Sequence, residues 1–354
     1  MNPDFLLYGA NGYTARLIIE QAARYGLKPI LAGRNAEKIA ELARQYALEY
    51  RIADLANAAT LDAALVGVPV VLHCAGPFSK TALPMQQACL RTQTHYLDIT
   101  GEVAVFEQGK ALHQQAVERQ IMLMSGVGFD VVPTDCMALH LKNKLPDATH
   151  LQLAFANNGG SVSRGTALTA VENLGTDGLI RQNGQLKAVP NAYKTLEVPF
   201  ELGRKHVCAT IPWGDLSTAY TTTAIPNIET YMAMTPGMIR GLRLGNTLGW
   251  LLGSKPVRTF LQKRIEKRLT GPDAGVRSRA RSLVWGRAEN KTGQSVEARL
   301  VCPEGYTLTA TMALIITQKV LNGNWQPGYQ TPAGLYGEGL VLEGGGEWGN
   351  RSAK

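Results

Sequence analysis

The stretch Phe5-Leu6-Leu7-Tyr8-Gly9-Ala10-Asn11-Gly12-Tyr13-Thr14-Ala15 decides the fold of the chain. A short apolar run ends at Gly9 and a helical pattern opens at Thr14, so the stretch predicts a strand, a glycine turn and a helix. Gly9 allows the sharp turn, Gly12 allows close approach of a pyrophosphate, and Ala15 lets the helix pack closely on the strand. The N–H groups at the helix N-terminus favour an anion. We therefore expect a dinucleotide-binding loop, with contacts from Gly9, Asn11, Gly12, Tyr13 and Thr14.

Strands and helices alternate along the first 125 residues, with short connections between them. We expect strands over residues 4–8, 29–32, 50–53, 70–74, 95–98 and 121–125, and helices over 14–25, 36–45, 84–91 and 103–119. This alternation is typical of a parallel sheet covered by helices on both faces. Such a set of strands matches a doubly wound, α/β dinucleotide-binding domain, which we place at residues 1–130.

The pattern changes near residue 130 and predicts a second domain of the α+β class over residues 131–326. We expect helices over 135–144, 164–174, 238–252, 257–269 and 307–321, and strands over 150–156, 282–289 and 295–302. Residues 290–294 supply a turn between the last two strands. Between residues 179 and 223 the sequence predicts loop and strand, and we expect the tail from Gly344 to be frayed.

The composition is typical of a globular protein in a reducing compartment. The 354 residues are 45% hydrophobic and 18% charged, which excludes a disordered chain. Five cysteines form no C-x-x-C pair, which indicates reduced thiols. The sequence runs from Met1 directly into the first strand, so we expect no signal peptide, and residues 242–252 are too short to span a bilayer. We therefore expect a cytoplasmic protein.

The formal net charge is +8, and much of the excess lies between Arg240 and Lys291. One interpretation of this basic segment is a solvated helix face and loop. The other is a landing surface for an acyl carrier, a CoA-type substrate or an anionic membrane surface. Nucleic acid is not expected as a partner, because no recognition module accompanies the charge.

An arginine takes the place where many NAD-binding domains carry an acid. The second strand ends in Ala32-Gly33-Arg34-Asn35, and Lys38 follows one turn later. A guanidinium can hold a 2′-phosphate, which a carboxylate would repel, so Arg34 and Lys38 predict NADP as the cofactor. The alternative is that Arg34 is an exposed loop residue and that Asn35 merely caps the next helix. Asp54, at the end of strand three, either lies near the adenine or caps a helix.

Two further strands end in loops at the same predicted sheet edge. In an open parallel sheet ligands lie beyond the carboxyl ends of the strands, so Cys74, Ala75, Gly76, Pro77 and Phe78 are expected near the nicotinamide half of the cofactor. Cys74 is interpreted as a packing residue rather than a nucleophile. The next strand ends in a polar cluster in which Tyr96 and Asp98 point to one face. Asp98, Thr100 and Glu102 could bind ribose or move a proton; the alternative is that Thr100 caps the following helix.

The last predicted strand of the first domain opens into Gly126-Val127-Gly128-Phe129-Asp130. We expect Gly128 and Phe129 to contact the cofactor and Asp130 to lie where a substrate would meet it, between the two domains. Asp130 and Asp135 could equally hold the domain junction. The six histidines show no H-E-x-x-H pattern, and no G-x-S-x-G or P-loop string occurs, so we expect neither a metal site nor a hydrolase.

Several motifs together resemble the saccharopine dehydrogenase-like oxidoreductases, and more closely their shorter branch, which includes trans-acting enoyl reductases. They are Tyr8-Gly9-Ala10-Asn11-Gly12-Tyr13-Thr14, Ala32-Gly33-Arg34, Cys74–Phe78, Tyr96–Glu102, Gly128–Asp135, Gly305–Ala310 and Thr331-Pro332-Ala333. The resemblance implies a Rossmann domain that binds NAD(P), a second domain that often dimerises, and a C-terminal segment, here residues 327–354, that returns to the first domain. The basic groups that a saccharopine substrate needs cannot be placed, so that substrate is not carried over.

The sequence therefore predicts an NADP-dependent oxidoreductase that transfers a hydride between the nicotinamide and a substrate C=C, C=O or C=N bond. The substrate is a small molecule or a carrier-bound, acyl- or lipid-like compound, and the protein is expected to be a homodimer. Tyr96, Asp98 or Asp130 is the expected proton donor or orienting group. The alternatives are a non-enzymatic NADP-binding redox sensor and a lipid-surface-associated binding protein.

Overall fold

A seven-stranded parallel sheet forms the centre of the first domain in the computed structural model, which describes residues 4–159, 163–172, 174–201, 204–247, 249, 254–268 and 271–349. Its strand order is β15-β6-β5-β4-β1-β2-β3. The strands are β1 (Phe5–Tyr8), β2 (Pro29–Gly33), β3 (Tyr50–Ile52), β4 (Val70–His73), β5 (His95–Asp98), β6 (Met122–Met124) and β15 (Gly328–Tyr329). The central strands are buried on both faces, as parallel strands under two helical layers must be. The predicted Rossmann fold is confirmed.

Alternation along the strands sends side chains into two cores. Phe5 and Leu7 face the core beneath α1 (Tyr13–Ala22) and α2 (Ala36–Tyr46), whereas Leu6 and Tyr8 face the core beneath α3 (Ala58–Leu65) and α4 (Phe78–Thr92). The helix predicted over 84–91 begins earlier, at Phe78, and α3 was not predicted. The helix predicted over 103–119 is two helices, α5 (Val103–Ala111) and α6 (His113–Glu118). In addition, a 3₁₀ turn, η1 (Ala23–Tyr25), follows α1.

The second domain is built on a nine-stranded sheet with β7 at its centre. The order is β10-β11-β12-β7-β13-β14-β16; in addition, β8 pairs with β12, and β9 pairs with β8. The strands are β7 (His150–Asn158), β8 (Gly178–Gln182), β9 (Gln185–Val189), β10 (Thr195–Glu201), β11 (Arg204–Thr210), β12 (Asn227–Ala233), β13 (Arg281–Glu289), β14 (Ser295–Pro303) and β16 (Glu347–Trp348). The predicted antiparallel pair of β13 and β14 is confirmed, with Glu289 opposite Ser295. The prediction of a frayed tail is wrong up to residue 349, because β16 pairs with β14 and Trp348 stacks on His140; residues 350–354 lie outside the described part.

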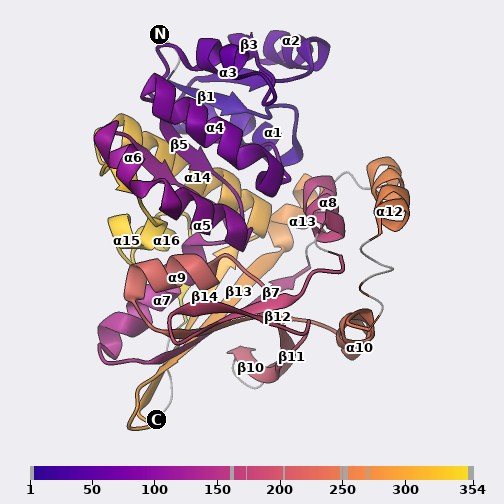
Figure 1. Cartoon of the computed structure of the whole chain (residues 1–354), viewed down its shortest axis with the longest axis vertical. Helices are drawn as coiled ribbons and strands as arrows, with labels where there is room; N and C mark the ends of the chain where they lie inside the picture. Colours follow the sequence, from indigo (N-terminus) through magenta and orange to yellow (C-terminus); the bar gives the residue numbers. More distant parts are fainter. Residues whose placement is uncertain are drawn as a thin grey trace.

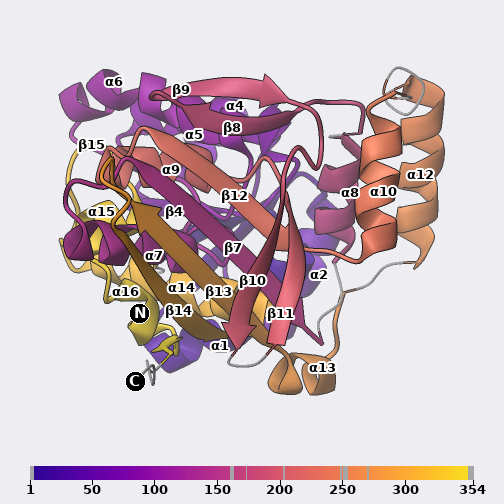
Figure 2. The same ribbon diagram turned by 90° about the horizontal axis from the view of Figure 1, so that it is seen from below.

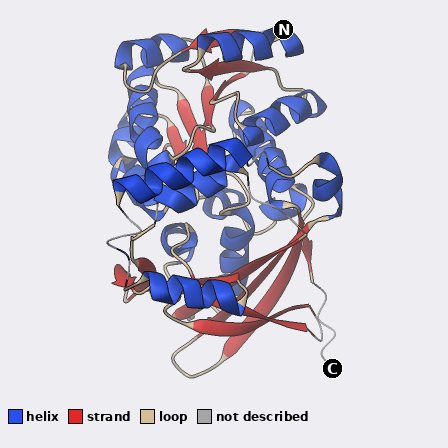
Figure 3. Cartoon of the chain, turned by 90° about the vertical axis from the view of Figure 1, so that its right-hand side faces the viewer, coloured by secondary structure: helices blue, strands red, loops and turns tan. Residues whose placement is uncertain are grey.

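Helices cover the face of the second sheet that looks toward the first domain. They include α7 (Val132–Lys144) and α9 (Asp215–Thr223), and Figure 3 shows the two sheets with helices between them. The opposite face carries no helix in the view of Figure 2. The prediction of loop and strand alone for residues 179–223 missed α9. The remaining helices are α8 (Arg164–Glu172), α10 (Pro236–Gly245), α12 (Lys255–Arg268), α13 (Ala274–Arg279), α14 (Gly305–Leu321), α15 (Pro332–Tyr336) and α16 (Leu340–Glu343).

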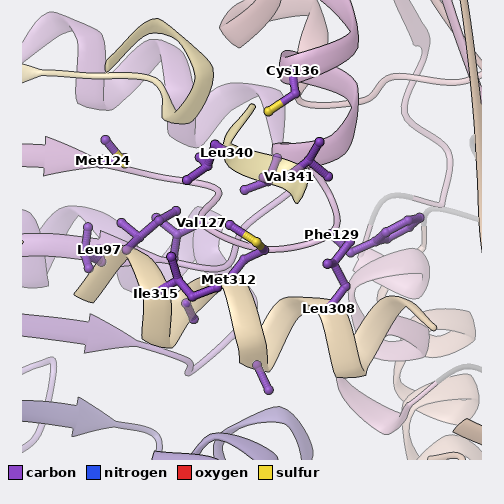
Figure 4. Close-up of a cluster of buried hydrophobic side chains, with 14 of the residues drawn as sticks. Leu97, Met124, Val127, Phe129, Cys136, Leu308, Met312, Ile315, Leu340 and Val341 are labelled. Atoms are coloured by element: carbon purple, nitrogen blue, oxygen red, sulfur yellow. The ribbon is translucent and has the colours of Figure 1, made fainter. Parts of the chain in front are cut away.

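One apolar core joins the two domains. The helix α14 follows the second sheet in the sequence but packs beside α1 and against β4 and β5. Its side chains Met312 and Ile315 lie close to Leu97 of β5 and Val127, and Leu340 and Val341 of α16 close the same cluster (Figure 4). These side chains are at most 8% exposed. Burial of apolar surface contributes about 25 cal/mol per Å² to the free energy of folding. Because the two domains share this core, it stabilises one arrangement of the domains.

Candidate active site

The glycine turn after β1 has the geometry that the sequence predicts. The N–H of Gly9 donates to the carbonyl of Ala32 at 2.8 Å, and its φ of +79° is one that L side chains rarely adopt. A Cβ added at Gly9 would lie 2.8 Å from the Cβ of Ala75, so the turn also brings the loops after β1 and β4 into direct contact. The N–H of Gly12 donates to the carbonyl of Gly9 at 2.9 Å, and Ala15 is fully buried.

The N-terminus of α1 suits an anionic ligand. Its N-cap is Gly12, which has no side chain to cap the helix, and no acidic residue lies in the first turn. Asn11 is exposed, and Tyr13 and Thr14 are partly buried. The N–H groups of a first helical turn need acceptors from outside the helix. The oxygens of a dinucleotide pyrophosphate fit this requirement.

Arg34 and Lys38 lie exposed beyond the end of β2, and neither forms an ion pair within the described residues. Asn35 caps α2, because its Oδ1 accepts the N–H of Lys38 at 3.0 Å. The exposure of Arg34 and the capping by Asn35, which the alternative interpretation named, are therefore both observed. Together they leave the Arg34 guanidinium available to a 2′-phosphate.

Asp54 lies in the turn after β3. Its Oδ1 accepts the N–H of Ala56 at 3.0 Å, whereas α3 is capped by Asn57. The alternative that Asp54 caps a helix is therefore wrong. The charges of Asp54 and Arg34 act in opposite directions on the Tyr8 hydroxyl, whose pKa burial raises to about 12. Both side chains thus lie near the carboxyl ends of β1 and β2, where an adenosine half would bind.

The loop after β4 is held from both sides. The N–H of Cys74 donates to the carbonyl of Tyr8 at 2.8 Å, and the carbonyl of Ala75 accepts from the Thr81 hydroxyl at 2.6 Å. Burial, and then the charge of Asp98, raises the pKa of the Cys74 thiol, so a thiolate nucleophile is disfavoured. This agrees with the interpretation of Cys74 as a packing residue.

The side chain of Glu102 caps α4 and makes no capping hydrogen bond to α5, the helix that Glu102 precedes. Its two carboxylate oxygens accept the N–H groups of Phe78 and Ser79 at 2.8 and 3.0 Å. Its own N–H donates to the hydroxyl of Thr100 at 3.1 Å. The link explains why α4 begins at Phe78, because a carboxylate at a helix N-terminus satisfies orphan donors and favours the dipole. Gly76 and Pro77 lie directly before this cap, joined by a cis peptide bond.

Asp98 and Tyr96 lie together, but inside the protein. The Tyr96 hydroxyl donates to Asp98 Oδ2 at 2.7 Å, and both side chains are fully buried. Asp98 also accepts from the Ser125 hydroxyl at 2.9 Å and from the N–H groups of Thr100 and Gly126 at 3.0 and 2.9 Å. Burial raises the pKa of Asp98, and the four hydrogen bonds oppose that rise. The arrangement ties β5 to β6 and favours a structural role for both predicted catalytic residues.

Asp130 is different, because its carboxyl accepts no hydrogen bond within the described residues. A Cβ added at Gly101 would lie 2.8 Å from Asp130 Oδ2, so the carboxyl packs directly on the backbone after β5. Burial raises its pKa to about 7. Its carbonyl accepts from the Trp213 indole N–H at 2.7 Å, which fixes the residue between the domains.

The neighbours of Asp130 hold the domains together. Asp135 accepts from the Thr222 hydroxyl at 2.7 Å and from the N–H of Ala333 at 2.8 Å, so it joins α7 to α9 and to α15 of the C-terminal segment. Phe129 donates its N–H to the Thr309 hydroxyl at 3.0 Å. A Cβ added at Gly128 would lie 2.6 Å from Thr309 Cγ2, so these two predicted cofactor contacts pack on α14.

Sequence reasoning missed Asp215, at the start of α9. It is fully buried, and burial together with the charges of Asp135 and Asp130 holds its pKa well above the usual value. No motif marks this residue, because α9 itself was not predicted and the contact with α7 joins distant segments.

Known proteins share both the loop and the fold. Residues 5–124 match the saccharopine dehydrogenase NADP binding domain. The chain is 27% identical over 213 residues to a human saccharopine dehydrogenase-like oxidoreductase, covering 52% of this chain and 50% of that protein. It is 32% identical over 152 residues to a trans-acting enoyl reductase of Mycobacterium leprae, covering 40% of this chain and 36% of that protein. It thus spans about half the length of the mammalian relatives that it matches.

A solved saccharopine dehydrogenase (L-Glu forming) of Saccharomyces cerevisiae has the same fold, with a TM-score of 0.67 over 99% of this chain and 100% of that one, at 14% identity. The fold, the glycine loop and the N-terminus of α1, which no side chain caps, define the first domain as a dinucleotide-binding Rossmann domain. Within that class, residues 5–124 match the saccharopine dehydrogenase NADP binding domain, which supports NADP as the cofactor. The predicted resemblance and the predicted cofactor are both confirmed.

Proposed function

We propose that the protein is an NADP-dependent oxidoreductase of the saccharopine dehydrogenase-like type. The observation that carries the proposal is the placement of Asp130. This residue follows β6 at the edge of the sheet that also carries the glycine loop after β1, and it lies at the domain junction. Open α/β sheets bind ligands beyond the carboxyl ends of their strands, so a nicotinamide and a substrate would meet there.

Asp130 is the residue to which we assign proton transfer. A general acid works best when its pKa lies near the working pH, and burial places the pKa of Asp130 at about 7. When bound, NADPH supplies the hydride to a C=C, C=O or C=N bond. The Asp130 carboxyl then gives its proton to the substrate atom that gains negative charge, and the Trp213 indole holds the Asp130 backbone in position.

NADPH oxidation with a panel of enoyl thioesters, ketones and imines tests the proposal. We expect turnover with at least one member, and Asp130→Asn to lower that rate by about 10²- to 10⁴-fold with NADPH affinity unchanged. Asp177→Asn, at an exposed acid of the second domain, is the matched control and should keep the rate. No oxidation with any panel member, or an unchanged rate in Asp130→Asn, would count against the assignment.

We further propose an acyl or lipid-like substrate delivered at a surface. Four apolar side chains are exposed on α10 and α12: Met238 (53%), Leu242 (36%), Leu244 (67%) and Phe260 (62%). No acidic residue occurs between residues 236 and 265, and both helices lie on the same side of the molecule (Figures 1 and 2). Exposed apolar groups beside basic ones suit an anionic lipid surface. No helix among the described residues is long and apolar enough to cross a membrane.

Liposome co-sedimentation tests this surface. We expect binding to vesicles with anionic lipid, weaker binding at high salt, and weaker binding again after Phe260→Ser. Binding that depends on neither anionic lipid nor salt would contradict the electrostatic part of the proposal.

The second candidate function is a non-enzymatic NADP-binding sensor. The observation that favours it is the saturation of Tyr96 and Asp98, two of the three expected catalytic side chains, by internal hydrogen bonds. Steady NADPH oxidation with any substrate of the panel would exclude this candidate. NADPH binding without turnover would support it.

A further inference from the structure

The second domain reaches the glycine loop of the first through Tyr13. Tyr13 is the first residue of α1, directly after the N-cap Gly12. Its hydroxyl donates to the carbonyl of Pro272 and accepts from Arg277 Nη1 at 2.9 Å. Its ring lies edge-on to Tyr306, with 5.1 Å between ring centroids. The segment before α13 therefore lies against the phosphate-binding loop.

The segment before α13 lies so close to the Tyr13 ring that the contact restricts the residue type at position 271. A Cβ added at Gly271 would lie 2.7 Å from the Tyr13 ring, and Gly271 has a φ of +99°. Both facts require glycine at this position. Asp273 then caps α13 by accepting the N–H of Val276 at 2.8 Å, which aims the short helix so that Arg277 faces Tyr13.

Arg277 is a cation held against the side chain of Tyr13, the first residue of α1. Its Nη1 also donates to the carbonyl of Pro272 at 2.8 Å, and its guanidinium carbon lies 6.0 Å from the centroid of the Tyr13 ring. It forms no ion pair within the described residues. The nearby carboxylate of Glu304 is occupied by the N–H and hydroxyl of Thr307. Among the described residues, Arg277 thus has no direct carboxylate partner.

The first domain provides few charges of its own for a pyrophosphate. Between Gly9 and Ala15 the loop carries no basic residue. Arg34 lies at the adenosine end of the sheet edge. Arg16 lies on another flank of α1, where its charge opposes the rise in the pKa of Tyr46 of α2 that burial causes. A dinucleotide brings two negative charges to the α1 N-terminus, where amide dipoles alone would meet them.

We propose that Arg277 is a cofactor-binding residue supplied by the second domain and that its guanidinium contacts the pyrophosphate of NADP. The proposal rests on the cofactor site of the proposed function. Guanidinium groups bind phosphate oxygens through paired N–H donors, and the contact adds to the amides of α1. Because the pyrophosphate is common to NADPH and NADH, Arg277 strengthens the binding of both cofactors equally, whereas Arg34 distinguishes them.

Fluorescence titration of the full chain with NADPH and with NADH tests the proposal without any turnover. We expect Arg277→Met to weaken the binding of both cofactors by the same factor, about 10-fold or more, as loss of a charge-assisted hydrogen bond implies. Arg279→Met is the matched control, because Arg279 is exposed on the same short helix, and it should bind both cofactors normally. Unchanged affinity in Arg277→Met would overturn the proposal.

Two further variants separate a phosphate contact from a structural one. Tyr13→Phe removes the hydroxyl but keeps the ring and the guanidinium, so we expect a smaller loss of affinity than in Arg277→Met. Equal losses in the two variants would show that Arg277 acts only through Tyr13 and would overturn the phosphate contact. Should Arg277→Met fold poorly, Arg277→Gln keeps a donor for Tyr13, and it must show the same equal loss for NADPH and NADH. Because these experiments measure binding constants, they test the role of Arg277 even if the protein turns over no substrate.

Discussion

Substitutions of Asp98 test whether its carboxylate has a structural or a catalytic role. The side chain is fully buried and accepts four hydrogen bonds, two from hydroxyls and two from backbone N–H groups. Asp98→Ala leaves those four donors without an acceptor, and a buried unsatisfied group costs about 1–3 kcal/mol. We therefore expect a loss of about 4 kcal/mol or more in the free energy of unfolding, a large part of the roughly 5–15 kcal/mol that a domain has.

Asp98→Asn gives the matched comparison. Its Oδ1 can keep both backbone N–H groups, and its amide can donate to the Tyr96 and Ser125 hydroxyls, which then act as acceptors. We expect a loss of only about 1–2 kcal/mol, with NADPH affinity retained. Urea unfolding followed by tryptophan fluorescence measures both variants. Asp98→Ala within 1 kcal/mol of the unmodified protein would refute the reasoning, as would an Asn variant that folds normally but has lost all turnover.

Three other predictions follow from the site. Arg34→Met should weaken NADPH binding by about 10-fold or more and NADH binding little; equal affinities of the unmodified protein for the two cofactors, measured by fluorescence titration, would contradict it. The pKa of Asp130 rises from 3.8 to about 7 on folding, so its contribution to stability is complete below about pH 4 and is lost as the pH rises through 7. The difference between the urea midpoints at pH 5 and 8 should shrink in Asp130→Asn, while the part due to Asp135, whose pKa burial raises to about 6, remains; an unchanged pH dependence would argue against the assignment. Gly9→Ala should cost about 2–4 kcal/mol in urea unfolding, because its φ is positive and Ala75 lies in the way; Gly26→Ala, with a similar φ and no atom within 4 Å, should cost only about 1–2 kcal/mol.

Local patterns were enough to predict much of the first domain. The alternation of apolar strands and helices follows from burial of a parallel sheet, and the glycine turn depends only on residues within it. The antiparallel pair of β13 and β14 was predicted because its turn lies between the two strands in the sequence. The expected homodimer stays a prediction.

Contacts between distant segments explain what could not be predicted. The start of α4 at Phe78 depends on Glu102, 24 residues later, and the order of the tail depends on pairing of Trp348 with Leu300. The same holds for the site. Tyr96 and Asp98 were correctly expected to share a face, but Asp98 is enclosed by the loop after β6, whose Ser125 and Gly126 come to lie beside it only after folding.

The most direct test of the proposed function is a structure of the protein with NADP bound. It should show the pyrophosphate on the N–H groups at the start of α1, the 2′-phosphate at Arg34, and Asp130 as the ionisable side chain closest to the nicotinamide C4. A nicotinamide ring directed away from the domain junction, with Asp130 out of reach of its C4 face, would contradict the account.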